Sequence, residues 1–146
     1  MAKKDLNIQL NKEAIIIYDG ECGICSALAE WILTKDKKSQ FSIVPYQNLD
    51  FEQFDNQLTI NQAKKSVVMI DKKNGKYYKA SRAVFEISKR LYGIYKVLGL
   101  IGSNPFVSSL FDPIYFIIAR YRRNISLWFG YKACKLDFDN KILEKN

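Results

Sequence analysis

A short apolar run near the N-terminus gives way to a helical pattern within a few residues. Ala14–Tyr18 has three isoleucines between an alanine and a tyrosine, and Asp19-Gly20 follows it directly. β-Branched residues in a run of this length, bounded by turn residues, predict a buried strand. Residues 23–35 then carry apolar side chains at helical spacing, so a helix should begin there. A buried strand that leads directly into a helix is typical of an α/β fold.

Three further strands and two further helices complete the predicted core. The strands are Phe41–Tyr46, Ser66–Ile70 and Lys76–Lys79, and an Asn-Gly turn joins the last two as a hairpin. We expect a helix with a weak apolar stripe over Leu49–Gln57 and a stronger helix capped by Ser81. The order β-α-β-α-β-β-α, with parallel first strands and an antiparallel edge, predicts a thioredoxin-like core.

Two Asx-Pro pairs mark the chain that follows this core. Asn104-Pro105 and Asp112-Pro113 each have the pattern of an N-cap followed by proline at the first helical position. They predict two short helices, over residues 105–111 and 113–123. The second helix has an apolar face, and the aromatic residues that follow it should pack back on the core. These residues are Ile114, Ile117, Ile118 and Tyr121 on the helix, then Trp128 and Phe129.

The predicted elements divide the chain into three parts. Residues 1–13 form an N-terminal tail, residues 14–134 a thioredoxin-like domain with a helical C-terminal extension over about 96–130, and residues 135–146 a C-terminal tail. The extension carries the basic cluster Arg120, Arg122 and Arg123, and the net charge of the chain is +8. We expect these arginines to form either a solvated helix face or a peripheral contact with an anionic membrane. Nucleic acid is not an expected partner, because lysines on an exposed hairpin edge have a structural explanation.

The composition narrows the chemistry available to the chain. It has 146 residues and no histidine, which excludes imidazole bases, imidazole metal ligands and cysteine–histidine nucleophile pairs. Three cysteines are too few for a disulfide-stapled secreted scaffold, and no apolar stretch reaches the roughly 18 residues of a membrane span. The charged N-terminus is unlike a secretory signal. We therefore expect a cytoplasmic protein, in which a close cysteine pair is more often catalytic or metal-binding than structural.

Cys22 and Cys25 stand three residues apart at the predicted start of the first helix. Residues at this spacing share a helix face and lie close enough to form a disulfide. Free backbone N–H groups and the positive end of the helix dipole favour a thiolate at Cys22. We predict that an exposed Cys22 attacks a disulfide and that Cys25 resolves the mixed disulfide. The expected partner is a protein disulfide or dithiol, and no cofactor is needed beyond an external electron donor or acceptor.

Asp19 completes the set of candidate catalytic residues. Its carboxylate could cap the helix, organise the loop or accept the proton of Cys25, although a plain turn aspartate would explain it equally well. A structural zinc site usually needs four ligands, and only Cys134 remains, so no metal is expected. Two inert buried cysteines stay an alternative. Cys134 is either structural or incidental, or an additional resolving thiol if the C-terminal segment folds over Cys22.

The segment YDGECGIC resembles the signature of the DCC family of thiol-disulfide oxidoreductases, named for its Asp-x-x-Cys-x-x-Cys motif. The resemblance continues through FSIVPYQ, KASRAVFEI and IYFIIARYRRNISLWFG, and so covers roughly residues 14–134. It implies a thioredoxin-like core with extra C-terminal helices and a redox role.

One departure from thioredoxins concerns the substrate groove. Thioredoxins carry a proline just before the third strand, facing the active cysteines, whereas Lys64, Lys65 and Ser66 stand here and Pro45 lies at the second strand. The groove must therefore be built differently, or the reaction differs.

The alternative function is a non-catalytic binding or redox-sensing module on a membrane surface or partner protein.

Overall fold

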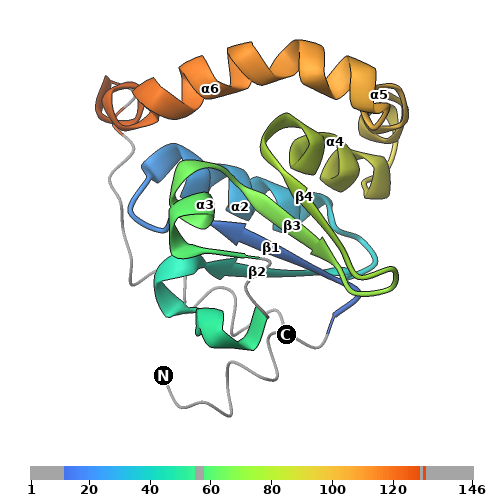
Figure 1. Ribbon diagram of the computed structural model, residues 1–146. Helices are drawn as coiled ribbons and strands as arrows, with labels where there is room; N and C mark the ends of the chain where they lie inside the picture. Colours follow the sequence, from blue (N-terminus) through green and yellow to red (C-terminus); the bar gives the residue numbers. More distant parts are fainter. Residues whose placement is uncertain (1–11, 55–57, 129, 131–146) are drawn as a thin grey trace.

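A four-stranded mixed sheet lies at the centre of the computed structural model, which describes residues 12–54, 58–128 and 130 (Figure 1). Its strands are β1 (Ala14–Tyr18), β2 (Phe41–Pro45), β3 (Val68–Asp71) and β4 (Lys76–Lys79). Their order is β2-β1-β3-β4, and β1 pairs parallel with β2 and antiparallel with β3. The hairpin of β3 and β4 forms the antiparallel edge. The predicted α/β, thioredoxin-like arrangement is confirmed.

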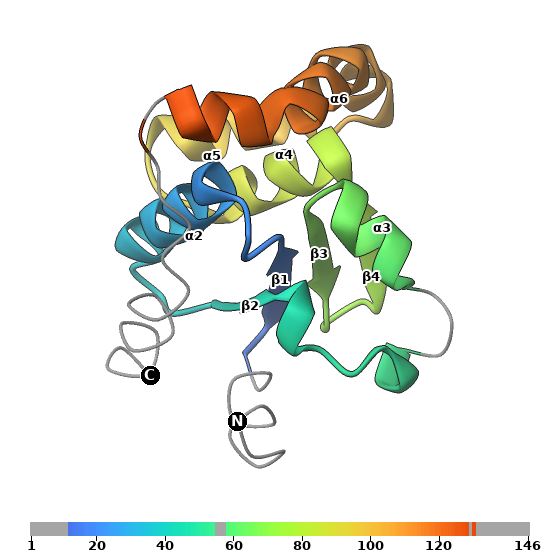
Figure 2. The ribbon, with the colours of Figure 1, turned by 90° about the vertical axis from the view of Figure 1, so that its left-hand side faces the viewer.

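Helices and loops cover both faces of the sheet, and every residue of β1 is buried. Ile16 faces the helices α2 (Gly23–Lys35) and α4 (Ala80–Arg90), whose inner residues complete one core cluster. Ile15 and Ile17 face the opposite way, toward Ala63 of α3 (Ile60–Lys65) and the residues before it. Figure 2 shows α3 on the far side of the sheet from α2. A strand buried on both faces explains the continuous isoleucine run.

Two C-terminal helices form a further layer outside α2 and α4. They are α5 (Ile94–Gly102) and the long α6 (Pro105–Trp128), which runs across the top of Figure 1. Gly99 and Gly102 allow α5 to approach α4 closely: a Cβ on Gly99 would lie 2.1 Å from the backbone nitrogen of Lys89, and one on Gly102 would lie 2.0 Å from the Phe85 ring. Among the described residues, no helix is both long and apolar enough to cross a membrane.

The prediction of two helices separated at Asp112-Pro113 is wrong, because α6 continues through Pro113. Asp112 does not cap a new helix. Its carboxylate accepts a hydrogen bond from Ser81, so it ties α6 to α4. Ser81 in turn does not cap α4, which begins at Ala80 without a side-chain cap. The Asn104 signal is confirmed: its Oδ1 accepts from the Phe106 N–H, 3.0 Å away, where α6 starts.

The prediction that Trp128 packs back on the core is also wrong, and the predicted apolar face of α6 is largely exposed. Ile114, Ile117, Ile118 and Tyr121 are each at least half exposed, and so is Trp128. The side of α6 that faces the core instead includes Ser108, Tyr115 and Arg122, which form hydrogen bonds to the core, and Ser126, which is buried. These polar contacts join apolar ones, such as the Phe85–Phe111 ring contact, on the side of α6 that faces inward.

Three smaller differences concern helices that local patterns did not reveal. A short 3₁₀ turn, Phe51–Phe54, occupies the described part of the helix expected over Leu49–Gln57, and another, Tyr46–Asn48, precedes it. The helix α3 was not expected, although Thr59 and Gln62 form a capping box at its start. Helix α5 was not expected either; Gly93, at φ +72°, separates it from α4. Phe129, Cys134 and most residues of both predicted tails lie outside the described residues.

Candidate active site

The loop after β1 is held tightly against the end of β2. The N–H of Gly20 donates to Gln47 Oε1, 3.1 Å away. A Cβ at position 20 would lie 2.9 Å from the Pro45 Cβ and 3.2 Å from Gln47 Oε1, so only glycine fits here without displacing its neighbours. The Asp-Gly pair is therefore more than a flexible turn, because it fixes the direction in which the chain enters α2.

Cys22 is the N-cap residue of α2, as the sequence predicts. Its backbone is extended, and its sulfur accepts from the Cys25 N–H at 3.4 Å. The thiol of Cys25 also donates to Cys22 Sγ, and the two sulfur atoms lie 2.8 Å apart. Both cysteines are free thiols. The spacing Cys-x-x-Cys thus brings the two sulfurs together at the positive end of a helix dipole.

This contact separates the acidities of the two thiols. The hydrogen bond from the Cys25 thiol is the largest cause that lowers the pKa of Cys22 from 9.0 to about 6. The Cys25 N–H and the Arg122 guanidinium also lower this pKa, while burial and the Asp19 carboxylate oppose them. The same thiol hydrogen bond, followed by burial and the Cys22 charge, raises the pKa of Cys25 well above 9.0. Near neutral pH, Cys22 is the thiolate and Cys25 keeps its proton.

The expectation that Cys22 is exposed is wrong. Only 1% of its surface is accessible, whereas Cys25 is partly exposed. The reason is the capping geometry itself: the sulfur of Cys22 turns back toward the amide and thiol of Cys25, so the first turn of α2 helps to cover it.

Asp19 lies within the same site as a fully buried carboxylate. Its Oδ1 accepts from the Glu21 N–H at 3.1 Å and from Gln47 Nε2 at 2.9 Å. Its Oδ2 accepts from Arg122 at 2.8 Å. Of the roles considered for Asp19, this geometry matches a loop organiser, and the cap position belongs to Cys22. Both carboxylate oxygens are engaged, as a buried charge requires.

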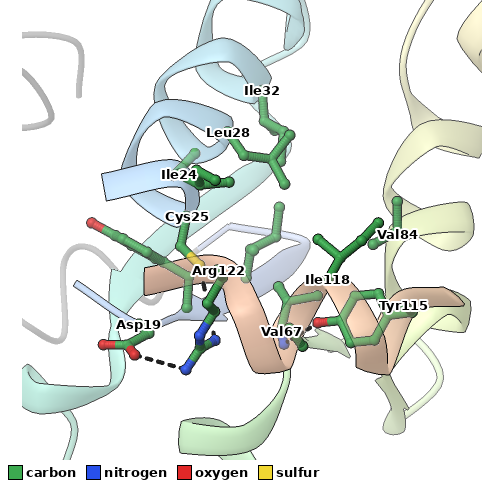
Figure 3. Close-up of a pocket in the computed structure, with 14 residues that line it drawn as sticks. Asp19, Ile24, Cys25, Leu28, Ile32, Val67, Val84, Tyr115, Ile118 and Arg122 are labelled. Carbon is green, nitrogen blue, oxygen red and sulfur yellow. Dashed lines mark hydrogen bonds and ion pairs between the residues drawn. The ribbon is translucent and has the colours of Figure 1, made fainter. Parts of the chain in front are cut away.

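Arg122 is the site residue that sequence reasoning missed. The prediction of a solvated arginine face fits Arg120 and Arg123, which are exposed, and is wrong for Arg122, whose side chain is only 12% exposed. Its guanidinium pairs with Asp19 and lies 3.9 Å from Cys25 Sγ (Figure 3). The signal in the sequence was ambiguous, because three arginines stand within four positions and the pattern does not say which one faces inward.

The segment before β3 is also held by α6. Arg122 donates to the carbonyl oxygen of Lys64 at 2.7 Å, and the Val67 N–H donates to the hydroxyl of Tyr115 at 2.9 Å. Thioredoxins carry their substrate-facing proline just before the third strand. Here that backbone is hydrogen-bonded to side chains of α6, so this segment differs from the one that carries the proline in thioredoxins.

A cavity of about 110 Å³ lies beside Cys25, between α2, α4 and α6. Figure 3 shows Ile24 and Leu28 of α2 pointing into it from one side and Ile118 and Tyr115 of α6 from the other. Its walls are almost entirely apolar, and the Asp19–Arg122 pair closes one end. The cavity therefore suits an apolar group placed next to a reacting sulfur.

The geometry supports thiol chemistry more directly than metal binding. Within the described part of the chain, no three Cys, Asp or Glu side chains are grouped so that they could hold a metal ion. The two adjacent sulfurs, one acidic and one not, are the arrangement that dithiol–disulfide exchange requires.

Comparisons with known proteins agree with this geometry. The family described as DCC1-like thiol-disulfide oxidoreductase matches residues 16–128, which contain the last three residues of β1, Cys22, Cys25 and the whole of α6. No curated protein and no solved structure matches the chain.

Proposed function

Because the chain belongs to the DCC1-like thiol-disulfide oxidoreductase family, we propose that it exchanges its Cys22–Cys25 dithiol with a disulfide in a protein substrate. The observation that carries this proposal is the contact of 2.8 Å between the two sulfurs at the N-terminus of α2. It gives one thiolate and one thiol within bonding reach. A cytoplasmic location is part of the same proposal and rests on the sparse use of cysteine.

In the reducing direction, Cys22 attacks one sulfur of the substrate disulfide. A bond forms between Cys22 and that sulfur, and the other substrate sulfur leaves as a thiolate. Cys25 then loses its proton, directly or through water, to the substrate thiolate already released, and its sulfur attacks Cys22. The Cys22–substrate bond breaks, the internal disulfide closes, and the second substrate sulfur leaves as a thiolate. Two electrons pass to the substrate, and an external dithiol or thiol restores the reduced protein. The reverse sequence oxidises a substrate dithiol.

The acidity of the two thiols supports this division of roles. With a pKa of about 6, Cys22 is ionised near pH 7 and is ready to attack. Cys25 holds its proton while it donates to Cys22, and this hydrogen bond is lost once Cys22 has bonded to the substrate. Because Cys22 is almost fully covered, the proposal also requires substrate binding to uncover its sulfur.

Trapping of mixed disulfides tests the proposal. All variants carry Cys134→Ser, so that only the two active-site cysteines can react. The probes are oxidised glutathione and a disulfide-linked peptide. Cys25→Ser should accumulate a stable adduct on Cys22, because no resolving thiol remains, and Cys22→Ser is the matched control.

Three outcomes of this experiment are distinguishable by mass spectrometry. An adduct on Cys22 alone supports the proposed roles. An adduct that forms only on Cys25 in the Cys22→Ser variant would reverse them. If neither variant forms an adduct with either probe, the chain does not carry out the exchange and the binding-module alternative is favoured.

A further inference from the structure

The outer sides of α5 and α6 carry an unusual density of exposed apolar side chains. Phe106 is 86% exposed, Leu110 74% and Ile117 60%, and they recur along one side of α6. Ile94 and Ile101 of α5 are exposed to a similar degree. We call the exposed apolar side chains of these two helices the outer apolar face. Single exposed apolar residues are ordinary, but a contiguous set marks an interaction surface.

The charged side chains that α5 and α6 leave exposed are all positive. The one acidic residue on these helices, Asp112, accepts a hydrogen bond from Ser81 of α4. Arg122 is turned inward to Asp19. The charged side chains left exposed on α5 and α6 are Lys96, Arg120 and Arg123, all positive. The outer apolar face therefore has a basic border and no acidic group.

From the exposed apolar side chains and their purely basic border we propose that the outer apolar face docks the protein on an anionic membrane surface. Helices that lie in the plane of a membrane place apolar and aromatic side chains at the boundary of the acyl chains and keep Lys and Arg near the headgroups. Each such cation near an anionic surface contributes attraction of about 1 kcal/mol. The proposal does not depend on the thiol chemistry.

A second copy of the chain fits this face less well. In a two-fold dimer both copies use the same face, so Lys96, Arg120 and Arg123 would each enter the interface twice. The exposed side of these helices has no carboxylate with which they could pair, and each chain carries a net charge of +8. An anionic lipid surface supplies the missing negative charge.

Co-sedimentation with vesicles tests the docking of the full chain. We expect binding to vesicles of phosphatidylcholine and phosphatidylglycerol, and binding on the order of 10-fold to 100-fold weaker to phosphatidylcholine alone. High salt should weaken the first binding. Ile117→Asp should abolish it. Ile60→Asp is the matched control, because Ile60 is 54% exposed and lies on α3, away from the outer apolar face.

Each of several results would overturn the proposal. One is the absence of binding to anionic vesicles by a chain whose urea midpoint shows it to be folded. Another is an equal loss of binding in Ile117→Asp and Ile60→Asp. A dimer that Ile117→Asp converts to a monomer would identify a second copy as the occupant. Binding that requires deletion of residues 131–146 would assign the face to the chain's own C-terminal segment.

Discussion

At the scale of single residues, the sequence predicted three members of the candidate site and did not predict the fourth, Arg122. Asp19, Cys22 and Cys25 stand within seven positions, and their spacing on a helix start predicts their proximity. Arg122 is 97 positions from Cys25. It belongs to a helix whose most apolar stripe is exposed, so the apolar pattern did not show that it enters the site.

The buried pair of Arg122 and Asp19 leads to a first prediction. Arg122→Gln leaves a fully buried carboxylate without its counter-charge, which should destabilise the protein by about 3–5 kcal/mol. The matched control is Arg123→Gln, because Arg123 is exposed; its effect should stay within about 0.5 kcal/mol. Urea unfolding measures both.

A double-mutant cycle distinguishes the ion pair from general disruption of α6. Asp19→Asn combined with Arg122→Gln should recover part of the lost stability, because no unpaired charge is then buried. If Arg122→Gln behaves like Arg123→Gln, the guanidinium does not stabilise the site.

At the scale of elements, sequence patterns predicted the bounds of those strands and helices that neighbouring residues determine. The bounds of β1, α2 and β4 match the prediction: β1 ends at the Asp-Gly turn, α2 begins at its cap Cys22, and β4 follows the Asn-Gly turn. Helices α5 and α6 did not follow the patterns. Glycine at position 99 and proline at position 113 both disfavour a helix by their intrinsic propensity. Packing against α4 overrides this propensity in α5 and α6.

The close approach of α5 to α4 leads to a second prediction. An alanine at position 99 would gain about 1 kcal/mol in helix propensity. Its Cβ, however, would lie 2.1 Å from the Lys89 backbone nitrogen and 2.7 Å from the Phe85 carbonyl oxygen. Backbone atoms cannot turn away as a side chain can, so the clash should win and Gly99→Ala should destabilise the protein by about 1–3 kcal/mol.

The matched control for Gly99→Ala is Leu100→Ala, the neighbouring exposed position on the same helix. It should change the urea midpoint little. A Gly99→Ala protein more stable than the parent would mean that α5 does not pack on α4 at this distance.

At the scale of the whole molecule, the opposed acidities of the two thiols predict how stability of the reduced protein varies with pH. The pKa of Cys22 is lowered from 9.0 to about 6, so its contribution is complete above pH 9 and is lost as pH falls toward 6. The pKa of Cys25 is raised, so its contribution is complete below pH 9 and is lost at higher pH. Stability should therefore rise between pH 6 and 9, with a slope of up to about 1.4 kcal/mol per pH unit, and then fall.

Urea unfolding with a reducing agent present, at several pH values, measures this dependence. The variant Cys22→Ser/Cys25→Ser keeps Asp19, Arg122 and all other titrating groups, so subtracting its profile isolates the two thiols. A parent and variant with parallel profiles would show that the fold does not separate the two acidities.

One contact described above bears on how substrates are chosen. The Val67 N–H is already occupied by the Tyr115 hydroxyl, so an incoming peptide cannot pair its own main chain there. Main-chain pairing is indifferent to sequence, so its loss at this position gives more weight to the side chains that flank the reactive cysteine of the proposed substrate. A substrate of the proposed exchange should accordingly carry a bulky apolar residue, rather than a charged one, beside the disulfide that meets the cavity next to Cys25.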